Sequence, residues 1–123
     1  MAEVSRKIHL FFQKEGVSEE AIYSLETALE EIVTNAVKYA FRKAKVHNID
    51  VTASVNAKAA ELVIENDGDV FDPTSVAEPD INRPLEKMPV GGLGIHLIRS
   101  LASGLEYRRE NDRNRLRVWV DKV

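Results

Sequence analysis

The chain has 123 residues, of which 44% are hydrophobic and 30% charged, and its formal net charge is −3. These values are typical of a globular domain and exclude a disordered chain, and the slight negative charge gives no electrostatic reason for binding nucleic acid. No apolar run approaches the roughly 20 residues that span a bilayer, no signal-peptide pattern is present, and no cysteine is available for disulfides or thiolate metal sites. We therefore expect a single domain over 1–123 in the cytoplasm, without direct contact to membrane or nucleic acid.

The N-terminal third of the chain predicts two helices. Residues 2–15 place apolar side chains at helical spacing, and Gly16 is a plausible stop. Ser18 is a good N-cap for a second helix, and acidic residues follow it in the first turn, where the helix dipole favours them. This second helix, over roughly 18–43, carries one continuous apolar stripe and is the strongest periodic signal in the sequence.

Beyond the second helix the hydrophobic period changes to two. The alternation predicts a strand over about 47–55, a turn at 56–58 and a return strand that carries the apolar positions of 60–64. All four prolines of the chain then fall within 72–90, where no period survives. An irregular loop of this length in a small domain is usually functional or mobile.

The C-terminal third predicts one more helix and a second hairpin. The helix is IHLIRSLA, closed by Gly104, and the hairpin joins 105–110 to 115–121 through a polar turn at Asn111–Asn114. The complete order is helix, helix, strand, strand, loop, helix, strand, strand. This order indicates an α+β two-layer sandwich with the helices on one face of a mixed, mostly antiparallel sheet.

The first group of residues with chemical potential lies on the long helix. Glu31 and Asn35 are four residues apart and therefore share one face. A carboxylate suits a general base, and an amide oxygen suits a hard cation such as Mg²⁺. Asparagine is a poor residue for a helix interior. Taken alone, however, the pair fits an ordinary solvated helix face better than a site.

Two further groups border the proline-rich loop. The stretch IENDGDVFDP ends an apolar strand with Asp67-Gly68, which is a good turn signal and lacks the ligand spacing of a calcium loop. The stretch VGGLGIHLIRS places glycines before a helix, where backbone N–H groups can approach a phosphate; a flexible hinge is the alternative. It is not a Walker A loop, and no strand immediately precedes it as a dinucleotide-binding fold requires.

In combination these groups resemble a known superfamily. Glu31 and Asn35 on a helix, Asp67-Gly68 after a hairpin, a long loop and then Gly92-Leu93-Gly94 before a helix resemble the GHKL ATPases, which include histidine kinases and gyrase B. Within that superfamily, EEIVTNAVKYAF, the DGxxFDP pattern and GGLGIHLIRSLASGLEYRRENDRNRLRV are similar to the anti-sigma factor serine kinases of bacterial partner switching. The resemblance runs from about residue 2 to the C-terminus and implies the histidine-kinase-like ATPase (Bergerat) fold.

The resemblance implies roles for individual residues. Glu31 takes the place of the general base, which accepts the proton of a serine hydroxyl in a substrate protein. Asn35 takes the place of the Mg²⁺ ligand, and the metal bridges the phosphates of ATP. The stretch 72–92 takes the place of the ATP lid. The phosphate-binding backbone is implied to be that of Gly92, Leu93 and Gly94.

The position implied to read adenine departs from the pattern of the family. Gly68 lets the base approach the backbone, but the aspartate expected two positions earlier is Asn66. Its amide oxygen can still accept from the adenine amino group, although the charge is absent and the amide nitrogen adds a donor. Asp67 would take over only in a shifted register. Tyr39 stands where relatives often carry histidine, and the strand that commonly precedes the first helix is not present, which predicts an exposed sheet edge and altered dimerisation.

The function implied is that of an anti-sigma-type serine/threonine protein kinase. Such a protein binds Mg·ATP, forms a homodimer, binds a sigma factor and phosphorylates a STAS-type antagonist. The alternative, motivated by Asn66, is a weak or inactive nucleotide-binding module that sequesters a regulator by protein–protein contact. ATP hydrolysis linked to a conformational cycle is disfavoured, because the relatives that work in this way use additional domains. A sensor histidine kinase is disfavoured, because no phosphoacceptor helix precedes the ATP-binding domain.

Overall fold

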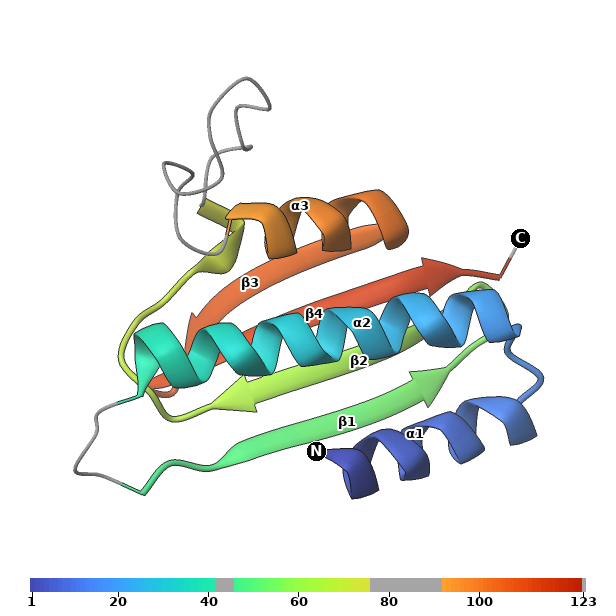
Figure 1. Ribbon diagram of the computed structural model, residues 1–123, viewed down its shortest axis with the longest axis horizontal. Coiled ribbons are helices and arrows are strands. Elements are labelled where there is room, and N and C mark those ends of the chain that lie inside the picture. Colours follow the sequence, from blue (N-terminus) through green and yellow to red (C-terminus); the bar gives the residue numbers. More distant parts are fainter. Residues whose placement is uncertain (42–45, 76–91, 123) are drawn as a thin grey trace.

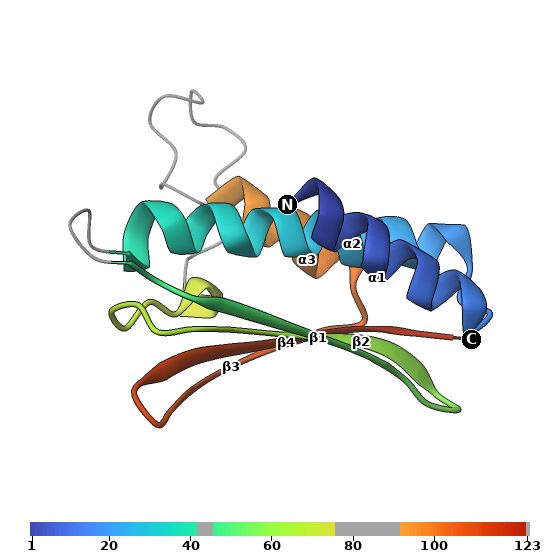
Figure 2. The ribbon, with the colours of Figure 1, turned by 90° about the horizontal axis from the view of Figure 1, so that it is seen from below.

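Two layers make up the computed structural model, which describes residues 1–41, 46–75 and 92–122. Helices cover one face of a four-stranded sheet whose strand order is β1-β2-β4-β3 (Figure 1, Figure 2). The predicted α+β two-layer architecture is confirmed. The expectation of a mixed sheet is wrong for the described strands, because each of their pairings is antiparallel.

The helices begin close to where the sequence predicts, but the second one ends differently. Ser18 caps α2, because its side-chain oxygen accepts a hydrogen bond from the Ala21 N–H at 3.1 Å. After Asn35 the backbone widens into a π-helical turn that ends at Ala40, and Phe41 is already extended, so Phe41 does not continue the predicted helix. The last predicted positions, 42 and 43, lie outside the described residues. The elements are α1 (Ala2–Lys14), α2 (Glu19–Asn35), the π turn (Ala36–Ala40) and α3 (Gly92–Leu101).

Both predicted hairpins are confirmed, and the second is tighter than expected. Its turn consists of Asn111 and Asp112, whose φ angles of 53° and 59° are typical of a type I′ turn. Asn114 therefore belongs to the strand and not to the turn. The strands are β1 (Ile49–Val55), β2 (Ala59–Asn66), β3 (Gly104–Glu110) and β4 (Arg113–Asp121).

The third helix and its flanks differ from the prediction in two respects. The helix begins at Gly92, so Gly92 and Gly94 lie within its first turn and not before it. Gly104 is the first residue of β3 and not a helix stop. It lies opposite Trp119, whose ring would be 2.0 Å from a Cβ at this position, so the strand pairing requires glycine there. Of the predicted loop, Pro73–Ser75 forms a short 3-10 helix, and 76–91 lie outside the described residues.

The core lies between α2 and the inward faces of β2 and β4. It contains the fully buried side chains of Phe12, Ile22, Leu25, Leu29, Leu62, Ile64 and Val118. At one end of the sheet the same inward face continues with Asn66, which pairs with Asn114 on the neighbouring strand. Two amides thus stand where the apolar core ends. None of the described helices is long and apolar enough to cross a membrane.

Candidate functional site

The C-terminal end of α2 carries a buried polar group that the fold does not satisfy. Asn35 is only 5% exposed, and its Nδ2 is the one buried side-chain nitrogen or oxygen without a hydrogen-bond partner in the part of the chain that the structure describes. Such a group costs about 1–3 kcal/mol. A buried amide that lowers stability in this way calls for an explanation outside the fold, such as a polar ligand.

Glu31, one turn earlier on α2, lies against the first turn of α3. A Cβ placed on Gly94 would be 2.1 Å from Oε2 of Glu31 and 2.9 Å from its Cδ, so only glycine leaves room for this carboxylate. Gly92 and Leu93 precede Gly94 in the same turn, where a helix leaves backbone N–H groups free and its dipole favours an anion. The structure therefore brings together the first and third groups predicted from the sequence.

The π turn at the end of α2 holds the second group in place. The Asp69 N–H donates a hydrogen bond to the Ala40 carbonyl at 2.8 Å, and a Cβ on Gly68 would lie at the same distance, 2.8 Å, from that oxygen. In the same turn, the Tyr39 ring lies 5.3 Å from the Phe71 ring. Turns of π geometry occur frequently at functional sites. Here the turn exposes a carbonyl that anchors the segment following β2.

The side chain of Asn66 is hydrogen-bonded to the segment that follows β2 and to β4. It is 3% exposed, and its Oδ1 accepts hydrogen bonds from the Gly68 N–H at 2.9 Å and from Asn114 Nδ2 at 3.0 Å. Asn114 Nδ2 also donates to the Asp69 carbonyl at 2.8 Å. A backbone N–H can only donate and a carbonyl can only accept, so these contacts fix which atom of each amide is oxygen and which is nitrogen.

Three residues of the second hairpin complete this network, and sequence analysis did not identify them. Asn114 Oδ1 accepts from the Tyr107 hydroxyl at 2.7 Å and from Arg109 Nη1 at 3.2 Å, and the same Nη1 donates to the Gly68 carbonyl at 2.8 Å. Burial raises the pKa of Tyr107 and outweighs the opposing effect of Arg109, so the hydroxyl stays a donor. The available signal was the alternation that places Asn114 two residues before Leu116, on the inward face of β4.

The Asp67 carboxylate is bonded to residues before β1 and not to the network around Asn66 and Asn114. Its Oδ1 accepts from the Asn48 N–H at 3.2 Å and lies 3.0 Å from Nδ1 of His47, whose ring stacks on Phe41. Burial raises the pKa of Asp67, but the hydrogen bonds from Asn48 and His47 outweigh it, and the net shift is downward. In the observed register it is Asn66 that pairs across the sheet on the inward face, so Asp67 does not take its place.

These groups fit a magnesium ion with nucleotide phosphates. Glu31 provides a carboxylate, Asn35 an amide oxygen and the first turn of α3 its backbone N–H groups, and these are donors that suit Mg²⁺ and phosphate. The described residues contain no group of three or more His, Cys, Asp or Glu that would cage a metal. Mg²⁺ usually takes only one or two protein oxygens together with substrate phosphates and water. The unpartnered Nδ2 of Asn35, which can donate to a phosphate oxygen but cannot bind a cation, and the cradle left by Gly94 are the structural observations that support the fit.

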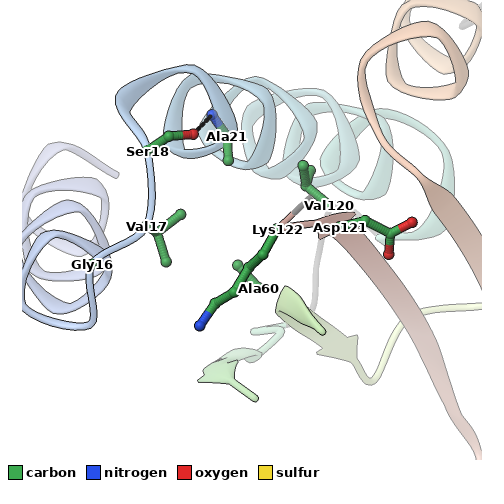
Figure 3. A pocket seen from close by; sticks show the side chains of 8 residues that line it. All are labelled: Gly16, Val17, Ser18, Ala21, Ala60, Val120, Asp121 and Lys122. Atoms are coloured by element: carbon green, nitrogen blue, oxygen red, sulfur yellow. Dashed lines mark hydrogen bonds between the residues drawn. The ribbon is translucent and has the colours of Figure 1, made fainter. Parts of the chain in front are cut away.

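A separate hollow of about 220 Å³ lies at the opposite end of α2 (Figure 3). It is bordered by the α1–α2 turn and by the end of β4, and its charged lining residues are Asp121 and Lys122. The length of α2, about 25 Å, separates it from Asn35. Its polar groups serve the fold, because the Ser18 side chain caps the helix and the Lys122 N–H bonds to the Lys58 carbonyl. We therefore place the candidate site at the C-terminal end of α2.

Comparisons with known proteins show the family to which the chain belongs. Residues 1–120 match the histidine kinase-like ATPase domain family. The chain is 33% identical over 90 residues to the serine-protein kinase RsbW of Listeria monocytogenes. The aligned residues cover 70% of this chain and 57% of that protein. It is 29% identical over 94 residues to the serine/threonine-protein kinase BtrW of Bordetella bronchiseptica, covering 76% of this chain and 66% of that protein. The chain thus spans little more than half the length of the first of these relatives.

Solved structures show the same fold. The catalytic domain of the histidine kinase ThkA has a TM-score of 0.62 at 13% identity, covering 98% of this chain and 91% of that chain. The blue-light activated histidine kinase of Erythrobacter litoralis EL346 has a TM-score of 0.62 at 18% identity, covering 86% of this chain and 32% of that chain. The resemblance to GHKL ATPases and to their α+β fold, found in the sequence, is confirmed.

Proposed function

Because the chain belongs to the histidine kinase-like ATPase domain family, in the group of the anti-sigma factor serine kinases, we propose that it is an ATP-dependent serine/threonine protein kinase. One observation supports the proposal above all. The Glu31 carboxylate rests against Gly94 at the start of α3, one helical turn from the unpartnered buried amide of Asn35. The proposed substrate is a serine of a STAS-type antagonist protein, the proposed partner is a sigma factor, and the proposed assembly is a homodimer.

Each residue of the proposed site has a distinct task. Asn35 Oδ1 would ligate Mg²⁺, and the backbone N–H groups of Gly92, Leu93 and Gly94 would bind the phosphates. The bound ion supplies neutralisation of the charge that the transferring phosphoryl group carries. Asn66 and Gly68 border the base. The predicted lid, about 72–92, lies largely outside the described residues and stays a prediction.

Glu31 acts as the general base. Its carboxylate accepts the proton of the substrate serine as the bond from the serine oxygen to the γ-phosphorus forms and the bond from that phosphorus to the departing ADP oxygen breaks. The contact with Gly94 positions this carboxylate beside the backbone that binds the phosphates. Phosphoryl transfer depends chiefly on such positioning and on charge stabilisation.

The direct test is transfer of radiolabelled phosphate from Mg·ATP to a STAS-type antagonist recovered with the protein from its source cells. We expect Glu31→Ala to lower transfer by about 10²-fold or more, in the range typical for loss of a general base. Glu30→Ala is the matched control, because Glu30 is the adjacent, exposed carboxylate of the same helix. The kinase proposal is wrong if the unaltered protein transfers no more phosphate than Glu31→Ala.

A second candidate is a nucleotide-binding module with weak or no kinase activity that sequesters its partner. It is favoured by Asn66, whose amide oxygen already accepts two hydrogen bonds within the protein. Calorimetry with magnesium complexes of ATP, GTP and ITP separates the two candidates. Binding without transfer supports the module, and failure of all three to bind at millimolar concentration leaves only a protein-binding role.

A further inference from the structure

The hydrogen bonds of Asn66 determine what its side chain can offer to a ligand. Its Oδ1 accepts from the Gly68 N–H and from Asn114 Nδ2. An amide oxygen has two lone pairs, and these two donors use both of them. The Gly68 N–H can only donate, so the amide cannot turn over to present its oxygen elsewhere without placing two donors face to face. Only Nδ2 of Asn66 is left, and an amide nitrogen can only donate.

The chemistry of this nitrogen suits a base that carries an acceptor. Adenine bears an amino group at C6, which is also a donor, whereas hypoxanthine and guanine bear a carbonyl oxygen there. We propose that Asn66 makes the nucleotide pocket selective for 6-oxopurine nucleotides, ITP and GTP, over ATP. This inference rests on the proposed function, in which Asn66 borders the base. It changes one part of that function, because the preferred phosphoryl donor becomes ITP or GTP instead of ATP.

Adenine has an acceptor, N1, beside its amino group, but a bond from Asn66 to N1 does not remove the mismatch. In that arrangement Asn66 offers no acceptor to the adenine amino group, because both lone pairs of Oδ1 are already used. The residue is only 3% exposed, so water has little access to replace the missing acceptor. Sites that hydrogen-bond one group of a substrate discriminate strongly against analogues that leave those polar atoms unpaired. The pocket therefore favours the carbonyl over the amino group at C6.

The neighbouring residues show why Asn66→Asp reverses the preference. In the variant, one carboxylate oxygen keeps the bonds to the Gly68 N–H and to Asn114 Nδ2. The second oxygen then stands where Nδ2 stood and accepts instead of donating. The shape of the side chain is almost unchanged, so the exchange tests the donor and acceptor pattern and not the packing.

The experiment is calorimetric titration of the complete chain with Mg·ITP and Mg·ATP, which differ in the base only at position 6 and its neighbouring N1. We expect the unaltered protein to bind ITP about tenfold more tightly than ATP, and Asn66→Asp to bind ATP about tenfold more tightly than ITP. Asn56→Asp is the matched control. It makes the same charge change at an exposed hairpin turn, where the amide oxygen also accepts two hydrogen bonds, both from backbone N–H groups. Its nucleotide preference should equal that of the unaltered protein.

Each other outcome has a definite meaning. Equal or tighter binding of ATP by the unaltered protein overturns the inference and leaves the proposed kinase intact. An equal change of both affinities in folded Asn66→Asp also overturns it, because Asn66 then does not read the base. If neither nucleotide binds, the proposed function and the inference both fail.

Discussion

The two ends of α2 follow different rules. At the N-terminal end, Ser18 caps the Ala21 N–H, and two glutamates occupy the first turn, where the helix dipole favours them. At the C-terminal end, Asn35 is buried with an unpartnered amide nitrogen, and the helix widens into a π turn. The first end is stabilised by its own residues. The second loses stability in the absence of a ligand and is therefore the end where a ligand is expected to bind.

This difference extends to the glycines on the two sides of the molecule. Gly104 makes room for the Trp119 ring, a contact that belongs to the sheet. Gly94 makes room for the Glu31 carboxylate, which no apolar packing requires. Substitutions at the end of α2 that carries Ser18 should therefore change stability. Substitutions at the other end should change ligand binding.

The largest effect on stability is expected from Gly104→Ala. The new Cβ would collide with the Trp119 ring, on which the Arg117 guanidinium is stacked at 4.3 Å from the ring centre. Overpacking of this kind costs about 1–3 kcal/mol. Urea unfolding followed by circular dichroism measures the loss and does not depend on Trp119, the single tryptophan. Adding Trp119→Val should restore most of it, and nucleotide affinity should stay unchanged in both variants.

Gly94→Ala should have the opposite profile. The Cβ would displace the Glu31 carboxylate, which is the end of a flexible side chain, so the fold absorbs the change. Alanine is also a better helix former than glycine, by up to about 1 kcal/mol. We expect the affinity for magnesium nucleotides to fall about tenfold, roughly 1.4 kcal/mol, with no loss of stability. Unchanged affinity in calorimetry would remove Gly94 from the proposed site.

A pair of alanine substitutions compares the two ends of α2 directly. Ser18→Ala removes a cap and should lower the free energy of unfolding by about 1 kcal/mol. Asn35→Ala removes a buried amide that has no partner at Nδ2 and should raise it by about 1 kcal/mol, while the dependence of nucleotide binding on Mg²⁺ is lost. Thermal unfolding of the two variants provides the measurement. Destabilisation by Asn35→Ala would indicate that the amide serves the fold.

The smallest effect concerns acid stability. The pKa of Asp67 is lowered from its ordinary value of 3.8 by bonds from Asn48 and His47 that outweigh burial. A lowered pKa means that the contribution of this carboxylate is complete above pH 3.8 and is lost as the pH falls through the folded-state pKa. Asp67→Asn should therefore be less stable than the unaltered protein at neutral pH, and the gap should narrow in acid. Urea unfolding over this pH range tests the sign.

The correct and incorrect parts of the sequence prediction follow the same division. The cap at Ser18, the stop near Gly16 and both hairpins were predictable, because local spacing and turn residues determine them. The π turn was not, because its Ala40 carbonyl bonds to the Asp69 N–H, a residue distant in sequence. Gly104 was assigned to a helix end, because the residue that requires glycine at this position, Trp119, lies on the neighbouring strand.

The candidate site shows a similar division. Order and residue type were enough to select Glu31, Asn35 and the glycines of α3, and the structure brings Glu31 and Gly94 into contact. The hydrogen-bond network around Asn114 was not predicted, because a polar residue beside a turn usually belongs to the turn. Only strand register reveals that Asn114 faces inward, opposite Asn66. The cross-strand partners of polar residues could therefore not be predicted from the sequence.

The central claim is that nucleotide binds at the C-terminal end of α2, and nuclear magnetic resonance tests it most directly. The backbone and side-chain amide signals of the protein are followed while Mg·ATP or Mg·ITP is added. We predict shifts in the stretches 31–40, 66–69 and 92–95 and in the side-chain amide of Asn35. Shifts confined instead to 16–21 and 120–122, around the hollow at the other end of α2, would contradict the account.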